Sequence, residues 1–132
     1  MTFNWRKYWW QPGCTAAFFA IGVPYWQIPY HKVNLPGALL GAGLVVLFAV
    51  TVLTRLYSGK SFMRVTMVLG AVAPAVVLAR VMFEVARDPA THNLWPFEVI
   101  IAIVVGGMVA LAGALLGSVV LRILRARRGE GE

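Results

Sequence analysis

The chain has 132 residues, of which 60% are hydrophobic and only 13% are charged, and its formal net charge is +7. A mean hydropathy of +0.76 over so short a chain leaves no room for a separate soluble domain. The basic residues stand at the ends of apolar runs, which is typical of topology signals and argues against a nucleic-acid partner. The sequence therefore predicts an all-α, polytopic integral membrane protein, with residues 1–132 forming one transmembrane domain of four helices.

The first apolar run covers residues 12–30 and is short, with Pro24 near its outer end. Its uninterrupted part is about 25 Å long, less than the roughly 30 Å of a bilayer core. Aromatic residues flank both ends in the manner of interfacial belts. They are Trp5, Tyr8, Trp9, Trp10, Tyr25, Trp26 and Tyr30. We expect a kinked full span here, with a re-entrant or surface-lying segment as the alternative.

The same run is not expected to be a cleaved signal peptide. Pro24, Trp26 and Pro29 occupy the positions where a small-residue cleavage site would be needed. Cys14 is the only cysteine, which excludes a disulfide within the chain and a thiolate metal cluster.

The next three runs cover residues 35–56, 62–87 and 96–124. The third run carries Pro74, which should kink it near Gly70 because proline removes a helical hydrogen bond. The second and third runs are joined by a short, flexible turn, so they should be antiparallel neighbours.

The basic residues predict the orientation. With four spans, nine of the twelve Lys and Arg residues share one side, and positive charge concentrates on the cytoplasmic side, so both termini should lie there. If the first run does not span, Arg6 and Lys7 change sides, and the basic residues divide seven against five between the two sides. The nine are Arg6, Lys7, Arg55, Lys60, Arg64, Arg122, Arg125, Arg127 and Arg128, and the other three are Lys32, Arg80 and Arg87.

Small residues at helical spacing predict where helices pack. In lipid, close backbone approach is a principal source of contact energy between helices. We expect the packing positions to be Gly37, Gly41, Gly106, Ala110, Gly113 and Gly117. Packing within one copy of the chain is the main interpretation, and contact with a partner or a second copy is the alternative.

One cluster of ionisable residues is a candidate site. Arg80, Glu84 and Arg87 share one face of the third run near its outer end, and intramembrane charges are functional hypotheses by default. Together with aromatic and amide side chains they could line a polar pocket open to the outside. The candidate residues are Arg80, Glu84, Arg87, Asp88, His92, Glu98 and His31. The structural alternative is that Arg80 pairs with Glu84 at i, i+4 and snorkels outward.

No catalytic, cofactor or phosphate-loop motif is present, and the histidines and carboxylates lack metal-ligand spacing, so we expect no cofactor and no metal. Carboxylates and a histidine at one bilayer face leave a minor alternative, a lipid-modifying enzyme. The sequence also offers no chain of polar groups across the bilayer. We therefore expect a non-enzymatic small subunit of a larger, transport-type complex in the bacterial inner membrane, whose partners are the lipid bilayer and another membrane protein or itself. The alternative is a homo-oligomeric transporter or channel.

Overall fold

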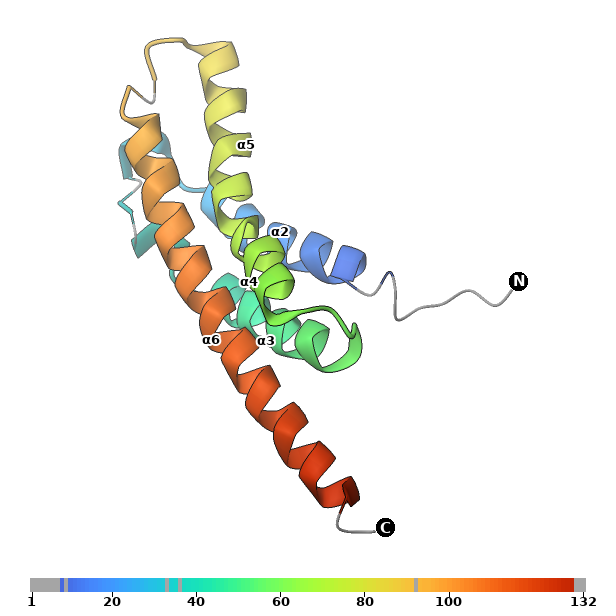
Figure 1. The fold of residues 1–132 in the computed structure, drawn as a ribbon. Coiled ribbons are helices and arrows are strands. Elements are labelled where there is room, and N and C mark those ends of the chain that lie inside the picture. The colour runs from blue at the N-terminus through green and yellow to red at the C-terminus, as the bar shows by residue number, and fades with distance from the viewer. Residues whose placement is uncertain (1–7, 9, 33, 36, 92, 130–132) are drawn as a thin grey trace, which may run out of the picture.

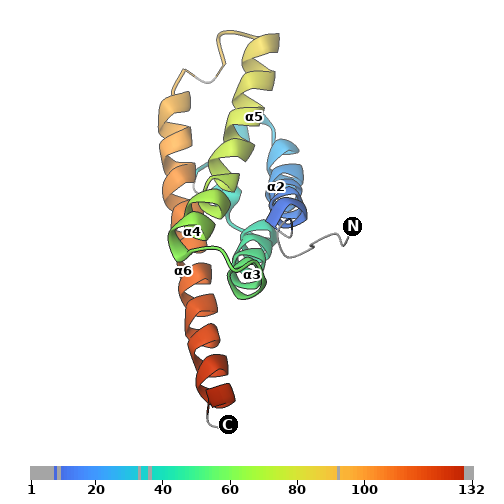
Figure 2. The ribbon, with the colours of Figure 1, turned by 45° about the vertical axis from the view of Figure 1, so that its right-hand side comes forward.

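The computed structural model describes residues 8, 10–32, 34–35, 37–91 and 93–129, and in these ranges all regular secondary structure is helical. The elements are α2 (Trp10–Trp26), η1 (Tyr30–Lys32), η2 (Gly37–Leu39), α3 (Ala42–Tyr57), α4 (Phe62–Gly70), α5 (Val72–Arg87) and α6 (Trp95–Gly129). α2 and α3 run side by side in opposite directions and cross α4, α5 and α6 obliquely (Figures 1 and 2). The all-helical class is therefore confirmed.

Two helices are long and apolar enough to cross a membrane. They are the α4–α5 unit, Phe62–Arg87, and α6, with 26 and 35 residues. α3 is apolar but has only 16 residues, and α2 has 17, whereas a perpendicular span needs about 20. The count of four spans stays a prediction.

The second helix begins later than expected, and this corrects the role given to two glycines. We predicted Gly37 and Gly41 as a packing pair inside the second span, but α3 begins only at Ala42. A Cβ atom on either glycine would meet no atom within 4 Å, so neither brings two backbones together. Gly41 has a φ of 157°, which L side chains rarely adopt, so it serves the turn into α3.

Pro74 divides the third run into α4 and α5, as its sequence position predicts. Without an N–H, Pro74 cannot pair with the Gly70 carbonyl, and the helix is interrupted between Gly70 and Val72. The freed carbonyl oxygen points to α6, where a Cβ atom on Gly106 would lie only 2.8 Å from it. The break in one helix is thus covered by a glycine of another.

The same arrangement joins α2 to α3. Pro24 lies inside α2 and leaves the Ala20 carbonyl without its helical partner. A Cβ atom on Gly43 of α3 would lie 2.6 Å from the Ala20 carbonyl oxygen, so only glycine allows this approach.

The buried side of α6 consists entirely of small residues. A Cβ atom on Gly113 would lie 2.9 Å from the Cβ of Thr51, and one on Gly117 would lie 2.8 Å from the Cβ of Arg55, both on α3. The absence of bulk lets backbones approach closely, which maximises van der Waals contact. The buried residues are Ala102, Gly106, Ala110, Gly113, Ala114 and Gly117.

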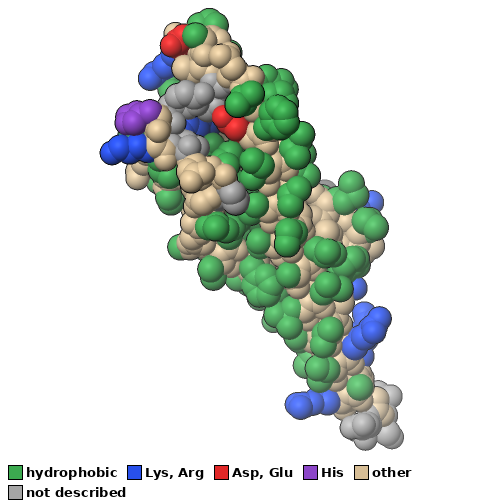
Figure 3. All heavy atoms as spheres, turned by 90° about the vertical axis from the view of Figure 1, so that its left-hand side faces the viewer, with side chains coloured by type: hydrophobic (Ala, Val, Ile, Leu, Met, Phe, Trp, Pro, Cys, Tyr) green, Lys and Arg blue, Asp and Glu red, His purple; other side chains and the backbone are tan. Residues whose placement is uncertain are grey.

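The opposite side of α6 is covered with large hydrophobic side chains. Val104, Met108 and Leu115 are each more than half exposed. Figure 3 shows hydrophobic side chains over most of one face of the molecule, with charged side chains towards its two ends. Such a distribution suits contact with lipid or with other apolar helices.

Gly106 and Gly107 provide a matched test of this packing. A Cβ on Gly106 would lie 2.8 Å from the Cβ of Ala73, whereas one on Gly107 would meet nothing within 4 Å. Gly106→Ala should therefore lower the free energy of unfolding by about 1–3 kcal/mol through overpacking. Gly107→Ala should leave it unchanged or slightly higher. Thermal unfolding of both purified variants in detergent checks this, and equal losses would contradict the packing described here.

Candidate functional site

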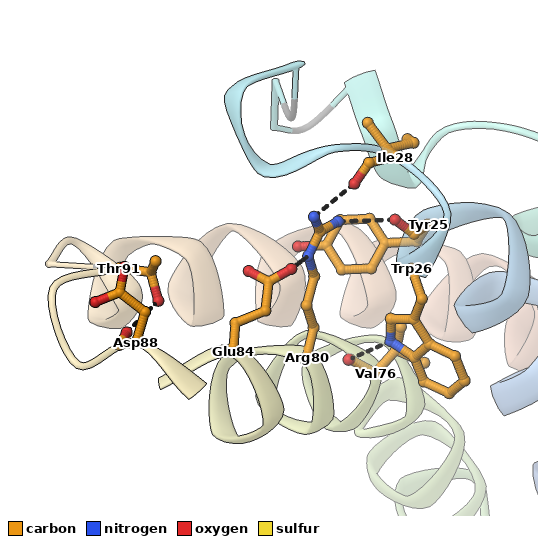
Figure 4. Close-up of polar contacts among 8 residues, drawn as sticks. All are labelled: Tyr25, Trp26, Ile28, Val76, Arg80, Glu84, Asp88 and Thr91. Atoms are coloured by element: carbon orange, nitrogen blue, oxygen red, sulfur yellow. Dashed lines mark hydrogen bonds and ion pairs between the residues drawn. The ribbon is translucent and has the colours of Figure 1, made fainter. Parts of the chain in front are cut away.

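Arg80 on α5 is the centre of the candidate site and is only 4% exposed. Its Nε donates to Glu84 Oε1 at 2.9 Å, in the i, i+4 ion pair that the spacing predicts. Its Nη1 donates to the Tyr25 carbonyl at 2.8 Å and its Nη2 to the Ile28 carbonyl at 2.6 Å (Figure 4). The guanidinium also lies 4.8 Å from the centre of the Tyr25 ring. Arg80 therefore does not snorkel outward but fastens α5 to the end of α2.

The end of α2 needs such a partner. Pro29 has no N–H, so the Tyr25 carbonyl cannot accept from residue 29 and accepts from the Ile28 N–H at 3.3 Å instead. The last turn of α2 also contains no basic residue to offset the negative end of its dipole. Arg80 supplies a second, charged donor to the Tyr25 carbonyl and the missing positive charge.

Two aromatic residues complete the contact between α2 and α5. The indole Nε1 of Trp26 donates to the Val76 carbonyl at 3.2 Å (Figure 4). The Tyr25 side chain is fully buried, and its phenol oxygen has no hydrogen-bond partner among the described residues. Glu98 is half-buried in the first turn of α6.

The other predicted site residues serve different purposes. Arg87 is exposed, with its guanidinium 4.2 Å from the centre of the Phe83 ring. Asp88 ends α5 and organises the following loop, because its Oδ1 accepts the Ala90 N–H at 3.0 Å and its carbonyl accepts the Thr91 hydroxyl at 2.8 Å. His31 is exposed in η1.

His92 lies outside the described residues. Arg80 and Glu84 share a depression whose described lining includes none of the other candidates, and the single outer pocket that the sequence suggested stays a prediction. This depression has a volume of about 340 Å³ and also adjoins Trp26. A separate one of about 640 Å³ lies between α5 and the loop that leads to α6, and includes Asn93 and Trp95. The polar groups are therefore divided between an internal ion pair, an exposed loop and two shallow surfaces.

A second arginine of similar function, Arg55, lies at the opposite end of the helices and was not among the predicted site residues. Arg55 Nε donates to Ser118 Oγ at 3.0 Å, and Nη1 donates to the Lys60 carbonyl at 3.3 Å. Arg55 thus joins α3, the following turn and α6. The only sequence signal was a serine within the apolar fourth run, since the Arg55 charge also fits a topology signal.

Within the part of the chain that the structure describes, no group of three His, Cys, Asp or Glu side chains could hold a metal ion. No family model matches this chain, and no curated protein or solved structure matches it either. Functional arguments therefore depend on the geometry of the chain itself.

Arg80→Gln should lower the free energy of unfolding by about 3 kcal/mol or more, because it leaves Glu84 and two carbonyls without their charged donor. Arg80→Lys should recover only part of this loss, since one ammonium group lacks the fork that reaches both carbonyls. The matched control is Arg87→Gln, an identical change at an exposed position of the same helix. Thermal unfolding in detergent measures all three, and a loss in Arg87→Gln as large as in Arg80→Gln would contradict this assignment.

Proposed function

We propose that this chain is a non-enzymatic, multi-pass membrane protein that acts as a small accessory or assembly subunit of a larger membrane complex. The supporting observation is the use of its buried charge. Arg80 is the one buried charged side chain among the described residues, and it is bound to Glu84 and to two carbonyls of α2. A charge used in this way stabilises the fold and is not free to bind a substrate.

The buried polar groups also support a subunit over a self-contained transporter. In the described ranges, the other buried polar side chains are Thr51 and Thr54, both near the end of α3 opposite Arg80. The Thr51 hydroxyl donates to the Leu47 carbonyl of its own helix at 2.7 Å. Between these threonines and Arg80 the core is apolar, whereas a coupled transport pathway needs a chain of polar groups.

The topology we propose has four spans with both termini inside, in the bacterial inner membrane. The nine-to-three division of basic residues supports it. The 16 and 17 residues of α3 and α2 correspond to about 24 and 26 Å. Local thinning of the bilayer would accommodate this at modest cost.

Cysteine labelling tests the topology in a Cys14→Ala background. Intact cells should label Ala90→Cys with a membrane-impermeant maleimide. Gln11→Cys and Gly129→Cys should react only after permeabilisation, because both termini are inside. All three positions are exposed on the chain itself. Labelling of Gln11→Cys in intact cells would overturn the four-span topology in favour of three spans.

Purification of tagged protein in native nanodiscs, with mass measurement of the intact assembly, tests the subunit role. We expect recovery with a larger membrane protein at fixed stoichiometry. Arg80→Gln and Glu84→Gln should lower abundance and complex recovery together, whereas Arg87→Gln should not. A homogeneous small homo-oligomer, whose flux is abolished by Arg80→Gln or Glu84→Gln at unchanged abundance, would instead establish the transporter alternative.

A further inference from the structure

A pocket of about 250 Å³ lies where the start of α2, the end of α3 and the start of α4 meet. This is the end of the molecule opposite Arg80, and it corresponds to the side that carries most of the basic residues. The lining combines two cations with a tryptophan and an apolar wall. These residues are Lys60, Arg64, Trp10, Val65, Val68 and Leu69.

The charges of the pocket favour an anion. Lys60 and Arg64 line it together, and no carboxylate is among the described lining residues. The backbone of Lys60 is held in place, because its carbonyl accepts from Arg55 and its N–H donates to Ser58 Oγ, each at 3.3 Å. The pocket also adjoins the positive end of α4, whose N-cap is Ser61.

A buried hydroxyl provides an independent indication of a ligand. Thr54 also lines the pocket and is only 1% exposed. Its Oγ1 has no hydrogen-bond partner among the described residues. A buried donor without an acceptor is rare in folded proteins. The Thr54 oxygen is enclosed by protein atoms, so a phosphate oxygen between Lys60 and Arg64 would accept from it once the Thr54 side chain rotates towards the pocket.

We propose that this pocket binds a phosphate group, carried by the headgroup of an anionic phospholipid. The cations and the Thr54 hydroxyl would hold the phosphate, while Val68, which is 36% exposed, and Trp10 continue the wall towards the apolar surface. Tryptophan is characteristic of the headgroup level. The lipid source rests on the proposed membrane insertion, whereas recognition of phosphate does not depend on the subunit role.

The test is thermal unfolding of the purified full chain in a neutral detergent, titrated separately with phosphatidylglycerol, phosphatidylcholine and inorganic phosphate. We expect phosphatidylglycerol to raise the unfolding temperature at much lower concentration than either other probe. Equal potency of inorganic phosphate and phosphatidylglycerol would support the phosphate site but assign free phosphate as its source. Equal potency of the two lipids would overturn the proposal.

Single substitutions test whether phosphatidylglycerol binds at this pocket. Lys60→Gln and Arg64→Gln should each weaken the binding of phosphatidylglycerol about fivefold, as expected for the loss of one surface charge. Arg127→Gln removes the same charge from an exposed position outside the pocket and should leave the titration unchanged. An equal effect of Arg127→Gln would show nonspecific attraction and overturn the proposal.

Thr54→Val tests the hydroxyl directly. Because Thr54 Oγ1 has no partner in the protein, removing it should not lower the unfolding temperature without lipid. The substitution should nevertheless weaken the binding of phosphatidylglycerol severalfold. An unchanged titration would show that the hydroxyl plays no part in binding and overturn its assignment. If no larger protein co-purifies with the chain, the proposed subunit role is wrong. The lipid titration would still test the phosphate site, because it does not depend on a partner protein.

Discussion

The constraint on which this fold depends is that a backbone carbonyl deprived of its helical partner must find another in apolar surroundings. Pro24 and Pro74 each free one such carbonyl inside a helix, and each freed carbonyl meets a glycine of another helix. The glycine allows close approach of its Cα, a geometry that supports weak Cα–H···O contacts. The pairs are Ala20 with Gly43 and Gly70 with Gly106. At the end of α2, the Arg80 guanidinium donates to the Tyr25 carbonyl. The contacts α2–α3 and α4–α6 are thus located by prolines, and the contact α2–α5 by Arg80.

Features that depend on local spacing could be predicted from the sequence, whereas those that depend on distant carbonyls could not. The apolar runs predict the helical class, and the break at Pro74 and the Arg80–Glu84 pair follow from positions a few residues apart. The acceptors of Arg80 are main-chain oxygens some fifty residues away, and every residue type has such an oxygen. Gly37 and Gly41 show the converse limit, because their spacing fits a helix that the chain does not form there.

The two ends of the helices use arginine differently. At one end, Arg80 is enclosed and its charge is offset within the chain. At the other, Arg55 is partly buried and holds the turn that carries Lys60, while Lys60 and Arg64 border an open pocket. The charge at the first end is thus satisfied within the chain, whereas the second end leaves two cations beside an open pocket.

The buried side of α6 reverses the usual relation between volume and stability. In a soluble core, the harmful substitution is generally one that removes atoms and leaves a cavity. Along the Gly and Ala stripe of α6 there is almost nothing to remove, so the limit is an upper one on side-chain size. The outer face of the same helix has no such upper limit on side-chain size, because its large side chains are exposed and contact no other helix of the chain closely. Substitutions should therefore accumulate unequally on the two faces of α6. Large apolar residues on the exposed face should replace one another freely, whereas Gly and Ala on the buried face should rarely change.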